Sequence, residues 1–146
     1  MIKTATIEDI EKLINRYPGI ANFICKGDED FTLMYIDNGE IIAVLSAFVR
    51  EIPAPLNGKT ECFINVIDVL DTNYHGKGIG SMLVQESINT AKSKNAMQVR
   101  AYCEINNISS HALWLRNDFG ISPVKEAGGS IVGSFVTYRL KEEANV

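Results

Sequence analysis

Glycines alternate with other residues at one point of the chain, between His75 and Ser81. An apolar run ends just before them at Val69 and Leu70, and a helical pattern begins at about Ile79. A strand, a glycine loop and a helix in this order leave backbone N–H groups unpaired at the start of the helix, where the positive end of the helix dipole also lies. Glycine also lets a ligand approach the backbone and permits positive φ angles. The pattern predicts a phosphate or pyrophosphate site, and a tight turn without a ligand is the alternative.

Two common nucleotide-binding patterns do not fit this loop. The ATP-binding loop requires Gly, four residues and then Gly-Lys-Ser/Thr, a spacing that is absent here. The dinucleotide fingerprint requires a third glycine where this chain has Ser81. Its acidic residue is expected about 20 positions further on, whereas Glu104, after the predicted strand Met97–Cys103, comes several positions too late. A nucleotide-binding domain is therefore disfavoured.

The segment from Tyr74 to Gly80 resembles the acetyl-CoA pyrophosphate loop of the GNAT superfamily of N-acetyltransferases. That loop reads Arg or Gln, two residues, Gly, one residue, and Gly or Ala. Here His75 stands where Arg or Gln is usual, and Gly78 and Gly80 are in register. The resemblance implies that main-chain amides hold the pyrophosphate, namely those of His75, Gly76, Lys77, Gly78, Ile79, Gly80 and Ser81.

A second resemblance to the same family lies further along the chain. The next helix of the family often begins with Asn, has a small residue three positions later and an aromatic residue four after that, and ends in Gly-Phe. The matching residues here are Asn107, Ser110, Trp114 and Phe119, with Asp118 in place of the glycine. The two matches stand in the order and separation of the family.

The resemblance implies a fold and a cofactor. The fold is an α/β protein with a mixed, mostly antiparallel central sheet that is splayed between two strands and carries helices on both faces, as a single domain over residues 1–146. The cosubstrate is acetyl-CoA, with backbone groups around Val69 and Leu70 pairing with pantetheine and holding the thioester carbonyl. The side chains of His75 and Lys77 reinforce the pyrophosphate site, or they are solvated loop residues.

The helix with Trp114 departs from the family pattern. The family often has a tyrosine here, whose hydroxyl donates a proton to the departing CoA thiolate. An indole N–H donates hydrogen bonds but is no acid near neutral pH, so Trp114 packs on pantetheine, donates to sulfur, or is a core residue. Solvent, Ser110 or the substrate would then supply the proton. Asn107 resembles the family residue that holds pantetheine, and it also suits a helix N-cap.

A general base is required because an alkyl ammonium, with a pKa of about 10.4, is protonated at neutral pH. Asp68 lies in a run that is otherwise apolar, so a desolvated carboxylate with a raised pKa is the first candidate. Pairing with a neighbour or exposure to solvent is its alternative. Glu61 and Glu104 are weaker candidates, and a water relay would need no single base. We expect His111 to be a packing or surface residue.

Composition limits the class of protein further. Hydrophobic residues make up 46% of the 146 residues and charged residues 22%, which is typical of a soluble globular domain. The net charge of −4 has no block of like charge, so nothing indicates nucleic-acid binding. No apolar run approaches the roughly 18 residues of a membrane span. Three unpatterned cysteines favour reduced thiols in the cytoplasm and suggest no metal site; two of them, Cys62 and Cys103, are expected to be inert strand thiols.

Periodicity and turn signals predict the elements that position these residues. The first half has a capping box at Thr6 and Asp9 before a helix that ends at Pro18-Gly19, and an Asn38-Gly39 hairpin turn. The central strand is nearly continuous in apolar residues, as in a strand buried on both faces. The predicted strands are Ile2–Thr4, Phe31–Ile36, Glu40–Arg50, Glu61–Leu70, Met97–Cys103, Ile121–Glu126 and Ile131–Leu140, with further helices from about Ile79 and over Ile108–Asn117.

These observations favour an acetyl-CoA-dependent N-acetyltransferase that acts on a primary amine of a small molecule or peptide by direct transfer in a ternary complex. The alternative is a domain of the same fold that binds acetyl-CoA without turnover, as a sensor or subunit. A monomer and a homodimer are both compatible with the sequence.

Overall fold

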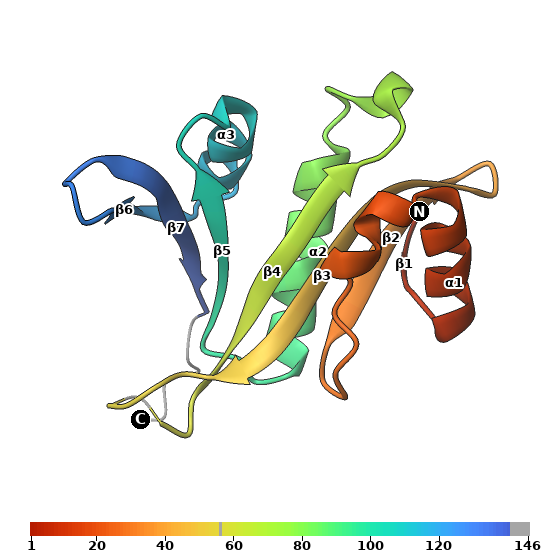
Figure 1. Cartoon of the computed structure of the whole chain (residues 1–146). Coiled ribbons are helices and arrows are strands. Elements are labelled where there is room, and N and C mark those ends of the chain that lie inside the picture. Colours follow the sequence, from red (N-terminus) through yellow and green to blue (C-terminus); the bar gives the residue numbers. More distant parts are fainter. Residues whose placement is uncertain (56, 141–146) are drawn as a thin grey trace. The chain divides into compact units, whose positions relative to one another are not determined.

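The computed structural model describes residues 1–55 and 57–140. Seven strands form one sheet in the order β1-β2-β3-β4-β5-β7-β6, which confirms the predicted α/β class (Figure 1). The contacts of the chain divide it into two compact units. The first contains Met1–Phe48 and Ile64–Ser87, and the second contains Val49–Phe63 and the described residues from Ile88 onward. None of the helices within the described ranges has the length and apolar character needed to cross a membrane.

The first unit begins with three antiparallel strands. Strand β1 (Ile2–Thr4) pairs with β2 (Phe31–Asp37), and β2 pairs with β3 (Glu40–Glu51). The turn between β2 and β3 has positive φ angles at Asn38 (51°) and Gly39 (75°), as a tight hairpin requires. The predicted hairpin is therefore confirmed.

Helix α1 (Ile7–Arg16) begins at the predicted capping box, in which the Asp9 amide donates to Thr6 Oγ1 and the Thr6 amide donates to Asp9 Oδ2. The 3₁₀ helix η1 (Pro18–Phe23) follows directly. A proline is not tolerated in the interior of a helix, so α1 ends before it, but a proline suits the first turn of the next helix. These helices cover one face of the strands in this unit. Their apolar residues form a core cluster with the sheet, made up of Leu13, Ile20, Ile24 and Val44, against which Val66 and Leu70 pack.

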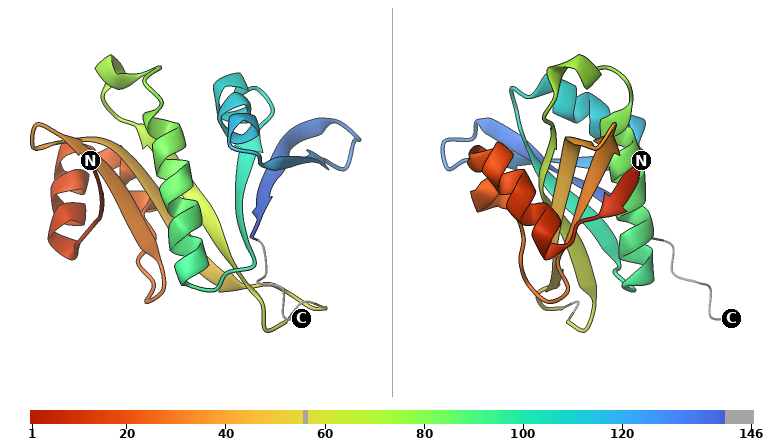
Figure 2. Two further views of the ribbon diagram at one scale, coloured as in Figure 1. Left: turned by 180° about the vertical axis from the view of Figure 1, so that it is seen from behind. Right: turned by 90° about the vertical axis from the view of Figure 1, so that its right-hand side faces the viewer.

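Helix α2 (Ile79–Ser93) supplies apolar residues to the same unit through its first turns. Ile79, Leu83 and Val84 are buried, at the spacing that the sequence predicted. Within this unit, Figure 2 shows α1 and the start of α2 on opposite faces of the strands. The helices thus enclose the strands from which the glycine loop departs.

The second unit is built on an antiparallel group of strands. Strand β5 (Gln98–Glu104) pairs with β7 (Ile131–Arg139), and β7 pairs with β6 (Gly120–Lys125). Helix α3 (Ile108–Arg116) packs through Trp114, whose ring contacts Phe119, which in turn contacts Tyr138 of β7. The buried alternate residues of β5 lie on the face that carries this aromatic stack; they are Val99, Ala101 and Cys103.

Strand β4 (Thr60–Val69) departs from the sequence prediction. Its first half is buried, including Glu61, Cys62 and Ile64, but Asn65 and Asp68 are exposed. The prediction of a strand buried on both faces is therefore wrong for the second half. The two polar residues interrupt the apolar run at positions where their side chains reach solvent.

Candidate functional site

The glycine loop connects β4 to α2 through the short 3₁₀ helix η2 (Thr72–Tyr74). Gly76 and Gly78 have φ angles of +75° and +79°, a region that L side chains rarely adopt. A Cβ placed on either residue would meet no atom within 4 Å. The loop therefore needs glycine because of backbone conformation, and the space beside these glycines is open.

The loop leads directly into the N-terminus of α2. The amide of Met82 donates to Gly78 O at 3.1 Å, so the hydrogen bonds of the helix begin here. The amides of the first turn of a helix are the ones that an external acceptor can meet. The first turn contains no acidic residue that could neutralise the positive end of the helix dipole. With Lys77 exposed beside it, this end of the helix suits an anion.

His75 lies against the strand from which the loop departs. Its Nε2 is 3.0 Å from Val69 O, so the ring N–H donates to that carbonyl. The next amide, that of Leu70, donates to Ile42 O at 2.8 Å. His75 thus fixes the start of the loop, and the Leu70 amide predicted to meet pantetheine is engaged with β3.

Tyr74 connects the loop to the β2–β3 hairpin, which the sequence did not indicate. Its hydroxyl donates to Asp37 Oδ2 at 2.6 Å, and this hydrogen bond to a carboxylate raises the pKa of Tyr74 to about 12. Lys77 Nζ lies 5.2 Å from the centre of the Tyr74 ring. No local pattern reveals such a contact, because its partners are far apart in the chain.

The three candidate bases have different environments. Asp68 and Glu104 are exposed, so the desolvation that motivated Asp68 is not present in this structure. Glu61 is 2% exposed and accepts hydrogen bonds from Arg100 and Arg50. Both carboxylate oxygens of Glu61 are thus occupied by internal donors, which leaves an acceptor ammonium little access to them and argues against Glu61 as a base.

The predicted residues at the start of α3 lie together in the second unit. Asn107 Oδ1 caps the helix by accepting from the Ser110 amide at 3.1 Å, which leaves the Nδ2 group of this exposed side chain as the part that could meet a ligand. Ser110 Oγ accepts from Trp114 Nε1 at 3.1 Å.

Trp114 itself is 2% exposed and therefore belongs to the core. Its ring offers almost no surface and its N–H already donates to Ser110 Oγ, and contact between Trp114 and the cofactor stays a prediction. In this structure Trp114 is a core residue of an amphipathic helix, which is one of the alternatives that the sequence offered.

A thiol and an imidazole meet beside the same cap. Cys103 Sγ lies 3.2 Å from His111 Nδ1, which is also 3.0 Å from Asn107 O. The pair joins the end of β5 to the first turns of α3. We expected the Cys103 thiol to be buried, and it is; we did not expect the histidine beside it.

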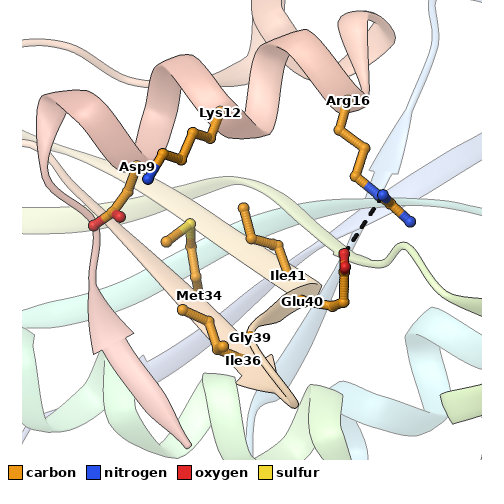
Figure 3. Close-up of a pocket in the computed structure, with 8 residues that line it drawn as sticks. All are labelled: Asp9, Lys12, Arg16, Met34, Ile36, Gly39, Glu40 and Ile41. Carbon is orange, nitrogen blue, oxygen red and sulfur yellow. Dashed lines mark ion pairs between the residues drawn. The ribbon is translucent and has the colours of Figure 1, made fainter.

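A separate pocket of about 260 Å³ lies in the first unit, between α1 and the hairpin of β2 and β3 (Figure 3). Met34, Ile36 and Ile41 project from the strands toward α1. The charged residues at this pocket are paired: Arg16 with Glu40 at 3.4 Å, Lys12 with Glu8, and Asp9 with Lys3. Its lining contains none of the predicted site residues. Within residues 1–55 and 57–140, no group of three or more His, Cys, Asp or Glu side chains could hold a metal ion.

Comparison with known proteins identifies the family. The sequence matches the Acetyltransferase (GNAT) family over residues 5–120, a range that runs through both units. The chain therefore belongs to the GNAT acetyltransferase family. No curated protein sequence matches it.

Solved structures share the fold at low sequence identity. The ribosomal-protein-S18-alanine N-acetyltransferase from Escherichia coli is 13% identical, with a TM-score of 0.73 over 99% of this chain and 96% of that one. Arabidopsis thaliana NAA60 in complex with acetyl-CoA is 14% identical, with a TM-score of 0.72 over 96% and 98%. The putative acetyltransferase yncA from Salmonella typhimurium, with its cofactor acetyl-CoA, is 17% identical, with a TM-score of 0.72 over 100% and 96%.

Proposed function

We propose that this protein is an acetyl-CoA-dependent N-acetyltransferase that acts on a primary amine. The observation that carries the proposal is the glycine loop, in which Gly76 and Gly78 at positive φ leave open space beside backbone that leads into the start of α2. A pyrophosphate fits there because a Cβ is absent, the dipole is unopposed by an acidic side chain and Lys77 adds a positive charge. Two of the structural neighbours above contain acetyl-CoA.

Residues of the chain would then have separate tasks. Amides from His75 to Ser81 would bind the pyrophosphate, and Asn107 Nδ2 remains a predicted contact to pantetheine. Bound acetyl-CoA supplies the activated acetyl group. An acceptor ammonium has to lose its proton before it can attack, and we assign that step to the exposed Asp68 or to a water relay, since Glu61 is held by arginines.

The acceptor is a primary amine of a small molecule or peptide. Neighbours of this fold are named for an alanine of a ribosomal protein and for phosphinothricin, which span both kinds of acceptor. We also propose a cytoplasmic protein without a resident metal, either a monomer or a homodimer; its three cysteines are all free thiols, which suits a reducing compartment.

Release of CoA thiol tests this function. Purified protein and acetyl-CoA should release thiol continuously with at least one acceptor from a panel of amino acids, polyamines, aminoglycosides and peptides, and mass spectrometry should find an acetyl group on its amine. The variant Asp68→Asn tests whether Asp68 is the base. If it is, loss of the carboxylate should lower kcat and change the dependence of kcat on pH.

A non-catalytic acetyl-CoA-binding protein is the second candidate. It is favoured by the burial of Trp114 where the family has an acid, and by the exposure of Asp68. Tight binding of acetyl-CoA without thiol release on any amine of the panel would support it and contradict the enzyme.

A further inference from the structure

The pocket between α1 and the β2–β3 hairpin lies within the first unit and has no task in the proposed acetyl transfer (Figure 3). We call it the α1 pocket. Three apolar side chains form its floor and three charged ones its rim: Met34, Ile36 and Ile41, and Lys12, Arg16 and Glu40. An apolar cavity of about 150 Å³ holds one benzene ring. The 260 Å³ of the α1 pocket therefore suits a larger apolar body, such as two fused rings.

The charges around this pocket are held with unequal strength. The Asp9 carboxylate accepts from the Thr6 amide, lies 2.9 Å from Lys3 Nζ and is only 17% exposed. Lys12 Nζ lies 3.4 Å from Glu8 Oε1, and these two side chains are 67% and 77% exposed. Exposed ion pairs contribute little to stability. The cation of Lys12 is therefore more available to a ligand than the anion of Asp9.

Arg16 lies one helical turn beyond Lys12 and is oriented by its neighbour Tyr17. Its Nε donates to the Tyr17 hydroxyl oxygen at 3.2 Å, and its guanidinium carbon lies 5.6 Å from the centre of the ring. Nη1 lies 3.4 Å from Glu40 Oε2, and both of these side chains are 59% exposed. This pair joins the last turn of α1 to the first residue of β3, and its exposure makes it weak. A ligand carboxylate can therefore replace that of Glu40.

We propose that the α1 pocket is a second ligand site, which binds a small molecule with a bicyclic apolar body and one carboxylate. The body packs on the floor of the pocket. The carboxylate replaces Glu40 as the partner of Arg16, with Lys12 one turn away on the same helix. An imperfectly filled space without a ligand is the competing explanation. A cationic ligand, attracted by Glu40 and Asp9, is the other.

The hairpin that forms one wall of this pocket also holds the start of the glycine loop. Asp37, at the end of β2, accepts from the Tyr74 hydroxyl at 2.6 Å. Displacement of Glu40 from Arg16 removes a contact between α1 and the hairpin, so Tyr74 is held less firmly. We expect the ligand to weaken acetyl-CoA binding, because a less ordered loop loses more entropy when it binds. This effect rests on the proposed function, whereas binding in the α1 pocket does not.

The first experiment locates the ligand without acetyl-CoA. Labelling with methyl-¹³C methionine gives one NMR signal for each of the four methionines, of which Met34 lines the pocket. The probe 2-naphthoate should shift the Met34 signal, which Met34→Leu assigns, and leave the other three unchanged. Two further probes, 2-naphthamide and 2-naphthylmethylamine, carry the same rings with no charge and with a positive charge. They should bind at least about threefold more weakly than the carboxylate.

Three results would overturn the ligand site. The Met34 signal stays unchanged at all probe concentrations, all four methionine signals shift together, or the carboxylate binds no more tightly than the amide. Tighter binding of the amine than of the carboxylate would assign the pocket to a cation and would also overturn the proposal.

The second experiment tests the pairing through opposite effects of two exposed residues. Arg16→Gln should weaken 2-naphthoate binding about threefold, because it removes the partner of the ligand carboxylate. Glu40→Gln should tighten it by a similar factor, because it removes the competing carboxylate. Arg116→Gln is the matched control, since Arg116 lies in the last turn of α3 as Arg16 does in α1, and it should bind like wild-type protein. Changes of the same sign in Arg16→Gln and Glu40→Gln, or no change in either, contradict the pairing.

The third experiment measures the effect on the glycine loop. Acetyl-CoA is titrated by calorimetry with and without saturating 2-naphthoate, which should lower its affinity by no more than Tyr74→Phe does. In Tyr74→Phe the probe should have no effect; an effect that persists there shows direct competition and contradicts the link through the hairpin. Unchanged affinity in wild-type protein also contradicts this link but leaves the ligand site standing. No binding of acetyl-CoA even without the probe contradicts the acetyltransferase instead.

Discussion

Tyr74 illustrates how single residues shape the glycine loop. Its hydroxyl donates to Asp37 at the end of β2, and His75 next to it donates to Val69 O. The loop is therefore fixed at its start, while Gly76 and Gly78 leave its backbone accessible. A preorganised loop binds a phosphate more tightly because less entropy is lost on binding.

Tyr74→Phe should weaken acetyl-CoA binding several-fold, since the phenyl ring remains but the bond to Asp37 is lost. Asp37→Asn and the double variant complete a cycle, and the effects of the two single variants should not add. Calorimetric titration measures the affinities. Additive losses would show that the two side chains act independently.

The same contact predicts a dependence on alkaline pH. The pKa of Tyr74 is raised from its ordinary value of 10.0 to about 12 by the bond to Asp37. Its contribution to stability is present below pH 10 and is lost as the pH rises toward 12. Urea unfolding should show a steeper decrease of stability over this window for wild-type protein than for Tyr74→Phe. Parallel curves would contradict the assignment.

Helix α1 depends on its first turn for part of its stability. The Thr6 amide and Lys3 both interact with the Asp9 carboxylate, and they lower its pKa from 3.8 to about 2. Because the folded-state pKa is lower, this stabilisation is complete above pH 3.8 and is lost as the pH falls toward 2. In Asp9→Asn the free energy of unfolding should therefore decrease less steeply between pH 3.8 and pH 2 than in wild-type protein. Glu11→Gln, on the same helix, is the control and should behave like wild-type protein.

Elements with strong local signals were predicted from the sequence. The capping box, the Asn38-Gly39 turn and the helix from Ile79 are confirmed with small shifts of their ends. Each depends on neighbours within a few positions of the chain, which a sequence displays directly. The GNAT loop was found for the same reason.

Features that depend on distant residues were not predicted. The contacts of Glu61 with Arg50 and Arg100 come from three strands, and Tyr74 meets Asp37 across the first unit. The exposure of Asp68 and the burial of Trp114 were each one of the alternatives that the sequence left open, because packing decides between them and periodicity does not. Candidate catalytic residues were therefore less predictable than the cofactor loop.

The whole molecule should unfold as one cooperative system. Strands β3 and β4 and helix α2 each contribute residues to both compact units, so neither unit keeps all of its elements if the other unfolds. Trp114, the single tryptophan, reports on the second unit from a buried position. Its fluorescence and the far-UV circular dichroism should follow one urea transition. Two separate transitions would show that the units unfold independently.

Binding of acetyl-CoA at the glycine loop tests the central claim most directly. Calorimetry should give saturable binding for wild-type protein and loss of binding for Gly78→Glu, which places a negative side chain where the pyrophosphate would lie. Gly129→Glu is the matched control, because Gly129 also has a positive φ (+87°) and open space, but lies in the turn between β6 and β7. It should bind like wild-type protein. Equal affinity of Gly78→Glu and Gly129→Glu, or no heat of binding with wild-type protein, would contradict the assignment.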